Sequence, residues 1–271
     1  IATFNLDPSR ASTYRSQVIW EEAIRRGMRV EQVCIYGKPI DTYRALIDGR
    51  WTYYDSLPVP PGLEQRGYLW IDDKYQLARQ LAARGIASPR SYSVTTLTAA
   101  KEAFLQLGQV TVKPRVGSRG RHTTTHISTI AQLEAAYRSA KMLCAWVVVQ
   151  KQLYGSVCRA TIVQGTLVGF FQADPPRVEG DGVSTIRDLV AKKNASRHER
   201  IQPVELSPEH ESFLSRQGYS FDTVLSRGMT IDLTHRTGRL FGGETRELLL
   251  TVHPKLREHV ERAACVLQAP V

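Results

Sequence analysis

The stretch VTVKPRVGSRGRH, residues 110–122, decides the fold prediction for this chain. It begins as a strand, because valines alternate with Thr111, and Pro114 ends the strand because proline has no N–H to donate. The loop that follows holds arginines, glycines and a serine, and no acidic side chain. Backbone amides beside glycines can wrap a polyanion, Ser118 adds a hydroxyl donor, and Lys113 supplies a fixed positive charge at the strand end. The stretch therefore predicts either a phosphate-binding loop or a solvated basic hairpin.

The composition narrows the classes of protein to consider. A formal charge of +10 and an isoelectric point near 9.6 favour anionic partners: nucleotides, nucleic acid, acidic peptides or a membrane surface. The four cysteines are widely spaced without a CxxC pair, which argues against a disulfide framework or a structural metal and fits a reducing cytoplasm. The longest apolar runs, such as residues 145–149, are too short to cross a bilayer. Neither GxxxxGK[ST] nor GxGxxG occurs, so the loop is not one of these two phosphate motifs.

The first 67 residues predict a small α/β domain. Residues 14–26 have the pattern of an amphipathic helix closed by Gly27, and residues 29–35 the pattern of a strand. Asp48-Gly49 is a hairpin signal between two strand-like runs. The PVPPG run at residues 58–62 predicts a stiff connector before a domain boundary.

The rest of the chain predicts strands and helices on either side of the glycine-rich loop. We expect a helix that begins at Asp72 or Asp73, a helix that begins at Thr98 and ends at Gly108, and one that begins at Ser128 or Thr129. The apolar run at residues 145–150 predicts a strand buried on both faces. Further strands are expected at residues 157–163, 167–172 and 229–233, and further helices at residues 184–193, after Ser207-Pro208, and from Pro254 onward.

Together, these pieces resemble the ATP-grasp superfamily. The pattern comprises a lysine near the start of a lobe (Lys74), the VKP strand end with its glycine loop, and an apolar strand that runs into the VVVQKQLYG hinge. The second half is similar to the cyanophycin-synthetase-like branch in its ordered motifs, namely Gly180-Asp181-Gly182, Ser184-Thr185-Ile186, Leu189, Asn194, Arg197, Gln217-Gly218, Gly242-Gly243 and Val252-His253-Pro254.

This resemblance implies an α+β fold in which two α+β lobes hold ATP between them, after the small α/β N-terminal domain. The implied domains are residues 1–67, a first lobe at 68–150 with the phosphate-binding loop, and a second lobe at 151–271 that is incomplete at its C-terminus. Because the sequence begins at Ile1 and stops at Val271 directly after a helical pattern, we expect both ends to be cut from a longer protein.

The resemblance also assigns roles to individual residues. Lys74 and Lys113 would contact the ATP phosphates, and Gly117, Ser118 and Gly120 would close over them. Arg159 would stabilise the transferring phosphoryl group or the tetrahedral intermediate. Backbone groups of the hinge would hold the adenine edge, at Gln150, Lys151 and Leu153.

The implied reaction is ATP-dependent ligation of a carboxylate to an amine through an acyl phosphate, with an amino acid or peptide as substrate. Two Mg²⁺ ions would bridge the phosphates, and their expected ligands lie beyond Val271, so the metal residues are unknown. Two other hypotheses stay open: a degenerate ATP-grasp module that binds nucleotide without turnover, and a basic nucleic-acid-binding protein, which charge alone suggests. We expect small-molecule or peptide partners and no membrane, and a homo-oligomer remains open.

Three positions depart from the family pattern. His122 replaces a glycine of the phosphate loop, which should stiffen it. Val157 replaces an acidic residue, and its side chain cannot bond a ribose hydroxyl. Ala173 replaces an arginine ahead of the proline pair. Asp181 also has a simpler interpretation as a turn former, because aspartate tolerates such backbone geometry.

Overall fold

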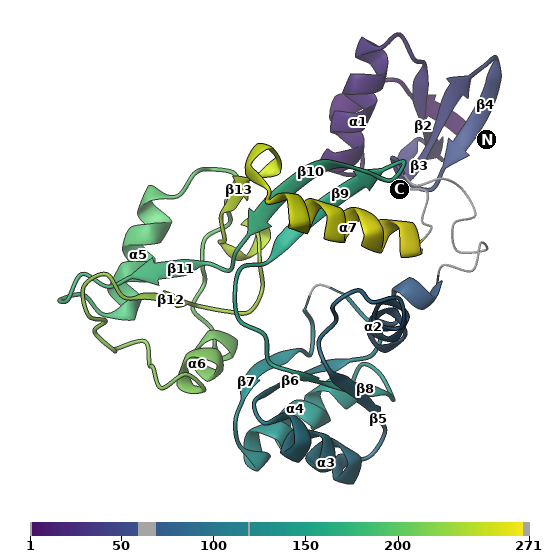
Figure 1. The fold of residues 1–271 in the computed structure, drawn as a ribbon. Coiled ribbons are helices and arrows are strands. Elements are labelled where there is room, and N and C mark those ends of the chain that lie inside the picture. Colours follow the sequence, from purple (N-terminus) through teal and green to yellow (C-terminus); the bar gives the residue numbers. More distant parts are fainter. Residues whose placement is uncertain (1, 59–68, 119, 268–271) are drawn as a thin grey trace. The chain divides into compact units, whose positions relative to one another are not determined.

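The computed structural model describes residues 2–58, 69–118 and 120–267. The chain forms two compact units, residues 1–69 and residues 70–270 (Figure 1). Most of the PVPPG connector lies outside the described residues. The predicted domain boundaries between residues 67 and 68 and between residues 150 and 151 both stay predictions.

The first unit is one helix on a four-stranded sheet, with Trp20 at the centre of its core. The Trp20 side chain is fully buried, donates from Nε1 to the Val30 carbonyl at 3.0 Å, and meets the Tyr43 ring edge-on at 5.8 Å. Asp48 and Gly49 both have positive φ and form the predicted hairpin turn. In sheet order β1-β2-β3-β4, with the helix added, the elements are β1 (Ala2–Asn5), β2 (Val30–Ile35), β3 (Lys38–Ile47), β4 (Arg50–Tyr54) and α1 (Tyr14–Arg25).

All strand pairs of this first unit are antiparallel. Two-residue turns join β2 to β3 and β3 to β4, and such short connections cannot make the crossover that parallel strands need. The unit therefore has an α+β organisation, in place of the α/β organisation expected from the sequence.

The second unit begins with an antiparallel sheet that carries the glycine loop between β6 and β7. Val147, Val148 and Val149 of its central strand β8 are at most 1% exposed, which confirms the prediction of a strand buried on both faces. In the sheet order β5-β8-β6-β7, followed by the helices, the elements are β5 (Ser91–Val94), β8 (Val147–Lys151), β6 (Val110–Pro114), β7 (Thr124–Ile127), α2 (Lys74–Ala83), α3 (Leu97–Leu107) and α4 (Ile130–Lys141).

The helix starts depend on which polar residue caps them. Asp73 caps α2, and Thr129 caps α4 in a reciprocal capping box with Gln132. The prediction that Thr98 begins α3 was wrong: the side chain of Thr96 accepts from the amide of Ala99. The run TTLTAA offers several threonines, and tertiary burial of the helix, rather than the local pattern, selects among them.

The rest of the second unit contains two smaller β-structures and three helices. Its core cluster includes the fully buried Ile186, Leu214 and Leu233. The elements are the sheet β13-β10-β9 (Thr245–Glu247, Thr166–Ala173, Cys158–Val163), the pair β11-β12 (Arg177–Glu179, Thr230–Asp232), and the helices α5 (Ile186–Ser196), α6 (Pro208–Ser215) and α7 (Pro254–Leu267).

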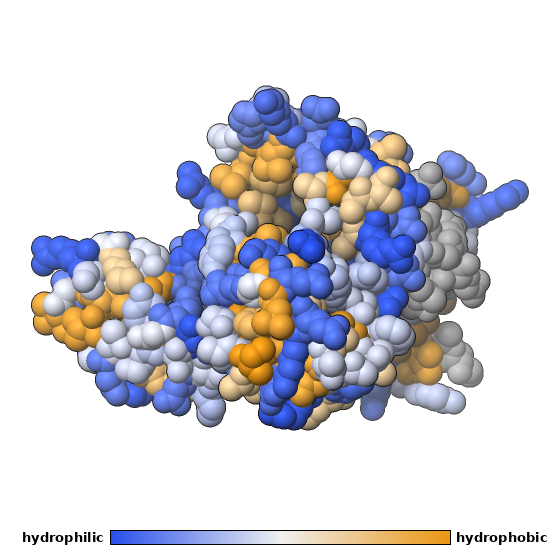
Figure 2. All heavy atoms as spheres, turned by 60° about the horizontal axis from the view of Figure 1, so that its bottom comes forward, coloured by the Kyte–Doolittle hydropathy of each residue, from blue (hydrophilic) through white to orange (hydrophobic). Residues whose placement is uncertain are grey.

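Hydrophobic and hydrophilic side chains are interspersed on the face that Figure 2 shows. Among the described residues, Leu105 and Met142 are 76% and 75% exposed. None of the helices in the described part of the chain combines the length and hydrophobicity that crossing a bilayer requires.

Candidate functional site

The two predicted phosphate lysines lie near each other, one on α2 and one on β6. Burial, with a further contribution from the Lys74 charge, lowers the pKa of Lys113 to about 8. Burial also lowers the pKa of Lys74, and the nearby carboxylates of Asp72 and Asp73 oppose this effect by raising it. Among the described residues, no carboxylate lies within ion-pair distance of either ammonium. Two adjacent cations without a counter-ion suit an anionic ligand.

Lys74 also reaches the glycine loop directly. Its ammonium donates to the Gly117 carbonyl at 2.6 Å, and its backbone N–H donates to the Arg115 carbonyl at 3.1 Å. The start of α2 is therefore fastened to the chain that follows β6.

Arg115 stabilises this junction instead of facing a ligand. Its Nε lies 2.7 and 2.9 Å from the two carboxylate oxygens of Asp73, which also accepts the first amides of α2. Its guanidinium stacks over the Trp146 ring at 5.3 Å. The charge of Arg115 is thus neutralised within the fold, whereas Lys113 and Lys74 have no ion-pair partner among the described residues.

The loop needs left-handed backbone at three positions. Gly117 and Gly120 have φ of +124° and +66°, as glycine allows. His122 has φ of +54°, a left-handed conformation that is uncommon for a residue other than glycine. The His122 ring lies 3.2 Å from the Ser139 hydroxyl, a contact that helps to hold this conformation.

The backbone of the hinge is already paired within the sheet at Gln150 and Lys151. Gln150 pairs with Ser91 on one side and Thr111 on the other, and the Lys151 amide donates to Arg90. The Lys151 ammonium donates to the Leu107 carbonyl at the C-terminus of α3, at 2.5 Å. The assignment of Gln150, Lys151 and Leu153 to adenine contacts stays a prediction, with the open edge beginning at the 58% exposed Leu153.

A cavity of about 680 Å³ brings Ser118 and Gly120 together with Arg159. Arg159 projects from β9 opposite Phe171, and in the described part of the chain no residue pairs with its guanidinium. His235 also lines this cavity and lies with Nε2 3.2 Å from the Gly120 carbonyl. Lys74 and Lys113 do not line it, so the predicted residues form two neighbouring groups. The remaining lining comes from Phe171, Ala173, Arg236, Thr237, Gly238, Arg239, Leu240, Phe241 and Thr245.

Sequence reasoning missed His235 and Arg239 as cavity residues. Both lie between β12 and β13, His235 just before and Arg239 within the run TGRLFGG at residues 237–243. No local pattern distinguishes these side chains, because their position depends on how this loop folds against β9 and β10.

The motifs of the second half serve the local fold. Asp181 accepts from the Ser184 amide and hydroxyl, both at 2.7 Å, and these bonds keep the pKa of its carboxyl well below the usual range. The Asn194 side chain bonds both backbone groups of Val204, at 2.8 and 2.9 Å. A Cβ on Gly180 would meet the Ser226 carbonyl at 2.3 Å. The turn-forming interpretation of Asp181 agrees with these contacts.

No three His, Cys, Asp or Glu side chains gather into a metal site within the described ranges. Glu247 accepts from the Leu249 amide at 2.8 Å. The described residues therefore do not fit a bound Mg²⁺ ion, and the metal residues stay unknown.

Comparisons with known proteins give a consistent set of relatives, although no protein-family model matches. Cyanophycin synthetase of Trichormus variabilis is 28% identical in an alignment of 203 positions that covers 71% of this chain and 22% of that protein. The glutathione biosynthesis bifunctional protein GshAB of Listeria welshimeri is 24% identical in an alignment of 272 positions that covers 94% of this chain and 34% of that protein. The chain thus spans between about a fifth and a third of the relatives it matches.

One solved structure shares the fold. The bifunctional glutathione synthetase from Pasteurella multocida gives a TM-score of 0.54 at 18% identity, and the match covers 94% of this chain and 35% of that chain. The fold is therefore a mixed α+β fold of the kind found in that ligase.

Proposed function

Because the chain is a homologue of the ATP-grasp ligases, we propose that it binds ATP and forms part of an ATP-dependent carboxylate–amine ligase. The observation that carries this proposal is the pair Lys74 and Lys113, two buried or half-buried ammoniums beside a glycine loop. A triphosphate brings the negative charge that this pair lacks in the described fold.

The proposed reaction has two steps. A carboxylate oxygen attacks the γ-phosphorus of ATP, the bond to ADP breaks, and an acyl phosphate forms. An amine then attacks the acyl carbon, loses a proton, and expels phosphate to leave an amide. Lys113 and Lys74 would hold the phosphates, and Arg159 would stabilise negative charge as it develops. Mg²⁺ would supply further charge on the phosphates, held by residues outside this set.

Arg159 fits this role because no described residue pairs with its guanidinium and because it shares a cavity with Ser118 and Gly120. A guanidinium that is already neutralised, as Arg115 is by Asp73, could not stabilise a new charge as effectively. The adenine edge would lie along the hinge at Gln150, Lys151 and Leu153. The amino-acid or peptide substrate and the cytoplasmic location are part of the same proposal.

A degenerate module that binds nucleotide without turnover is the second candidate. Val157 and Ala173 favour it, because neither side chain can supply the charge or hydrogen bond expected at its position. The strained His122 also favours it, since closure of the loop would have to preserve a costly backbone conformation.

Calorimetry with ATP, followed by an ADP-release assay, separates these candidates. A ligase should release ADP only when both a carboxylate and an amine substrate are present. Nucleotide binding without ADP release across amino acids and dipeptides would select the degenerate module. Binding of polynucleotide that falls steeply with salt and ignores ATP would support the nucleic-acid alternative instead.

A further inference from the structure

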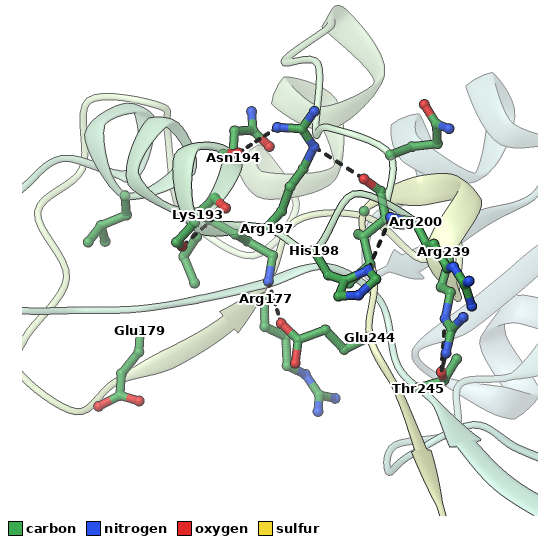
Figure 3. Close-up of a pocket in the computed structure, with 16 residues that line it drawn as sticks. Arg177, Glu179, Lys193, Asn194, Arg197, His198, Arg200, Arg239, Glu244 and Thr245 are labelled. Atoms are coloured by element: carbon green, nitrogen blue, oxygen red, sulfur yellow. Dashed lines mark hydrogen bonds and ion pairs between the residues drawn. The ribbon is translucent and has the colours of Figure 1, made fainter.

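A second cavity, of about 630 Å³, lies wholly within the segment from β11 to β13 (Figure 3). Five of its lining side chains are cationic and two are carboxylates. The charged residues are Arg177, Lys193, Arg197, Arg200 and Arg239, with Glu179 and Glu244.

Three of the cations already have partners. Arg177 bonds Asp232 and Asp174, each at 2.5 Å. Lys193 pairs with Glu244 at 3.1 Å. Arg197 donates to the backbone carbonyls of Asn194 and Ile201, as Figure 3 shows, so two of its N–H donors are used although its charge is not neutralised. These contacts shape the cavity wall.

The other two guanidinium groups, those of Arg200 and Arg239, have no charged partner among the described residues. Arg239 donates to a neutral acceptor, the Thr245 hydroxyl, at 3.1 and 3.2 Å. The Arg200 side chain has no hydrogen-bond or ion-pair partner among the described residues, and only its backbone N–H bonds His198. A guanidinium fork matches the two oxygens of a carboxylate or phosphate, so this wall is suited to an anion.

This cavity adjoins the one that holds Arg159. Arg239, the first residue of the short helix η4 (Arg239–Phe241), and Thr245 line both cavities and so form a common wall. A ligand with one end at Arg159 could therefore extend past Arg239 toward Arg200.

We propose that the second cavity holds an anionic group, a carboxylate or a phosphate, of the molecule that the chain ligates. This proposal rests on the proposed ligase function and defines its substrate class: a molecule with at least one anionic group besides the carboxylate that reacts. Arg200 and Arg239 bind that distal group and so set which substrates fit.

Two probes and a matched pair of variants test the proposal. The 271-residue chain is titrated by calorimetry with a tetra-aspartate peptide and, separately, with inorganic tripolyphosphate. Arg200→Ala should weaken the binding of at least one probe about tenfold, the loss expected when a charged hydrogen bond is removed. Arg227→Ala removes the same charge from an exposed position that lines neither cavity, and should change affinity less than about twofold.

The outcomes distinguish the source of the anion and the two proposals. Tetra-aspartate binding that depends on Arg200 assigns a carboxylate, and tripolyphosphate binding that depends on Arg200 assigns a phosphate. Equal losses in Arg200→Ala and Arg227→Ala, a loss in Lys113→Ala alone, or no binding of either probe would overturn the second site. Mg-ATP affinity is measured on the same samples: if ATP binds normally while the probes fail, only the second site is refuted, whereas absent ATP binding refutes the ligase proposal.

Discussion

The Lys74 ammonium donates a 2.6 Å hydrogen bond to the carbonyl of Gly117, 43 residues further along the chain. This bond places a cation against the loop that is proposed to cover the phosphates. A bound phosphate would compete with the carbonyl for the same ammonium.

We expect Lys74→Ala to loosen the loop even without nucleotide. A net hydrogen bond to a charged group contributes about 1.5–3 kcal/mol when well formed, and this one is partly solvated, so about 1 kcal/mol is a fair expectation. Amide hydrogen exchange at Gly117 and Ser118 should then accelerate about fivefold. Arg79→Ala, a change on the same helix, serves as the control. Unchanged exchange in Lys74→Ala would mean that the bond does not restrain the loop.

Replacing Lys113 should weaken ATP binding far more than replacing Arg115. Lys113→Ala removes an unpaired charge at the proposed phosphate site, and we expect a loss of about 2 kcal/mol, or about thirtyfold in affinity. Arg115→Ala removes a charge that Asp73 neutralises, so its main effect should be a lower melting temperature. Calorimetry for ATP and thermal denaturation of both variants check this. Equal affinities would refute the phosphate-loop assignment.

The lowered pKa of Lys113 predicts opposite effects of pH on binding and on stability. ATP affinity should fall as pH rises through about 8, because the ammonium then loses its proton. In the unfolded chain this lysine titrates near 10.5, so between about 8 and 10.5 the unfolded state binds more protons and the contribution of Lys113 to stability increases with pH.

Comparing the chain with Lys113→Met isolates this group from the other titrating residues. The variant should lose both pH effects that are specific to Lys113, in ATP calorimetry and in denaturant titrations from pH 7 to 10. Identical pH profiles for the two proteins would show that Lys113 does not titrate in this range.

The sequence predicts features that depend on neighbours along the chain. Asp48-Gly49 specifies its hairpin because both residues tolerate positive φ, and Asp73 caps α2 through amides two and three residues away. The valine run at 147–149 signals a strand covered on both faces. These elements follow from local chemistry.

Features that depend on contacts between residues far apart in the sequence could not be predicted from the sequence. Arg115 follows the strand end of the basic loop in sequence, and only its approach to Asp73, 42 residues earlier, neutralises its charge. Arg239 reaches the same cavity as Arg159 although 80 positions separate them. The motifs that carry the resemblance to the ATP-grasp ligases include a residue with strict packing needs, Gly180, which is a different property from contact with a ligand.

Gly180 offers a direct test of whether the GDG motif serves packing or ligand contact. Its backbone φ is not in the left-handed region, yet a Cβ there would lie 2.3 Å from the Ser226 carbonyl and 2.6 Å from the Leu225 Cβ. Gly180→Ala should therefore force the backbone apart and cost more than about 2 kcal/mol of unfolding free energy. Gly165 has φ of +79° with no atom within 4 Å of an added Cβ, so Gly165→Ala should cost only about 1 kcal/mol from backbone strain.

Urea denaturation measures the unfolding free energy of both variants, and a smaller loss for Gly180→Ala than for Gly165→Ala would contradict a packing role for the motif. If Gly180→Ala instead leaves stability unchanged but reduces ligand binding, the GDG turn belongs to the binding site.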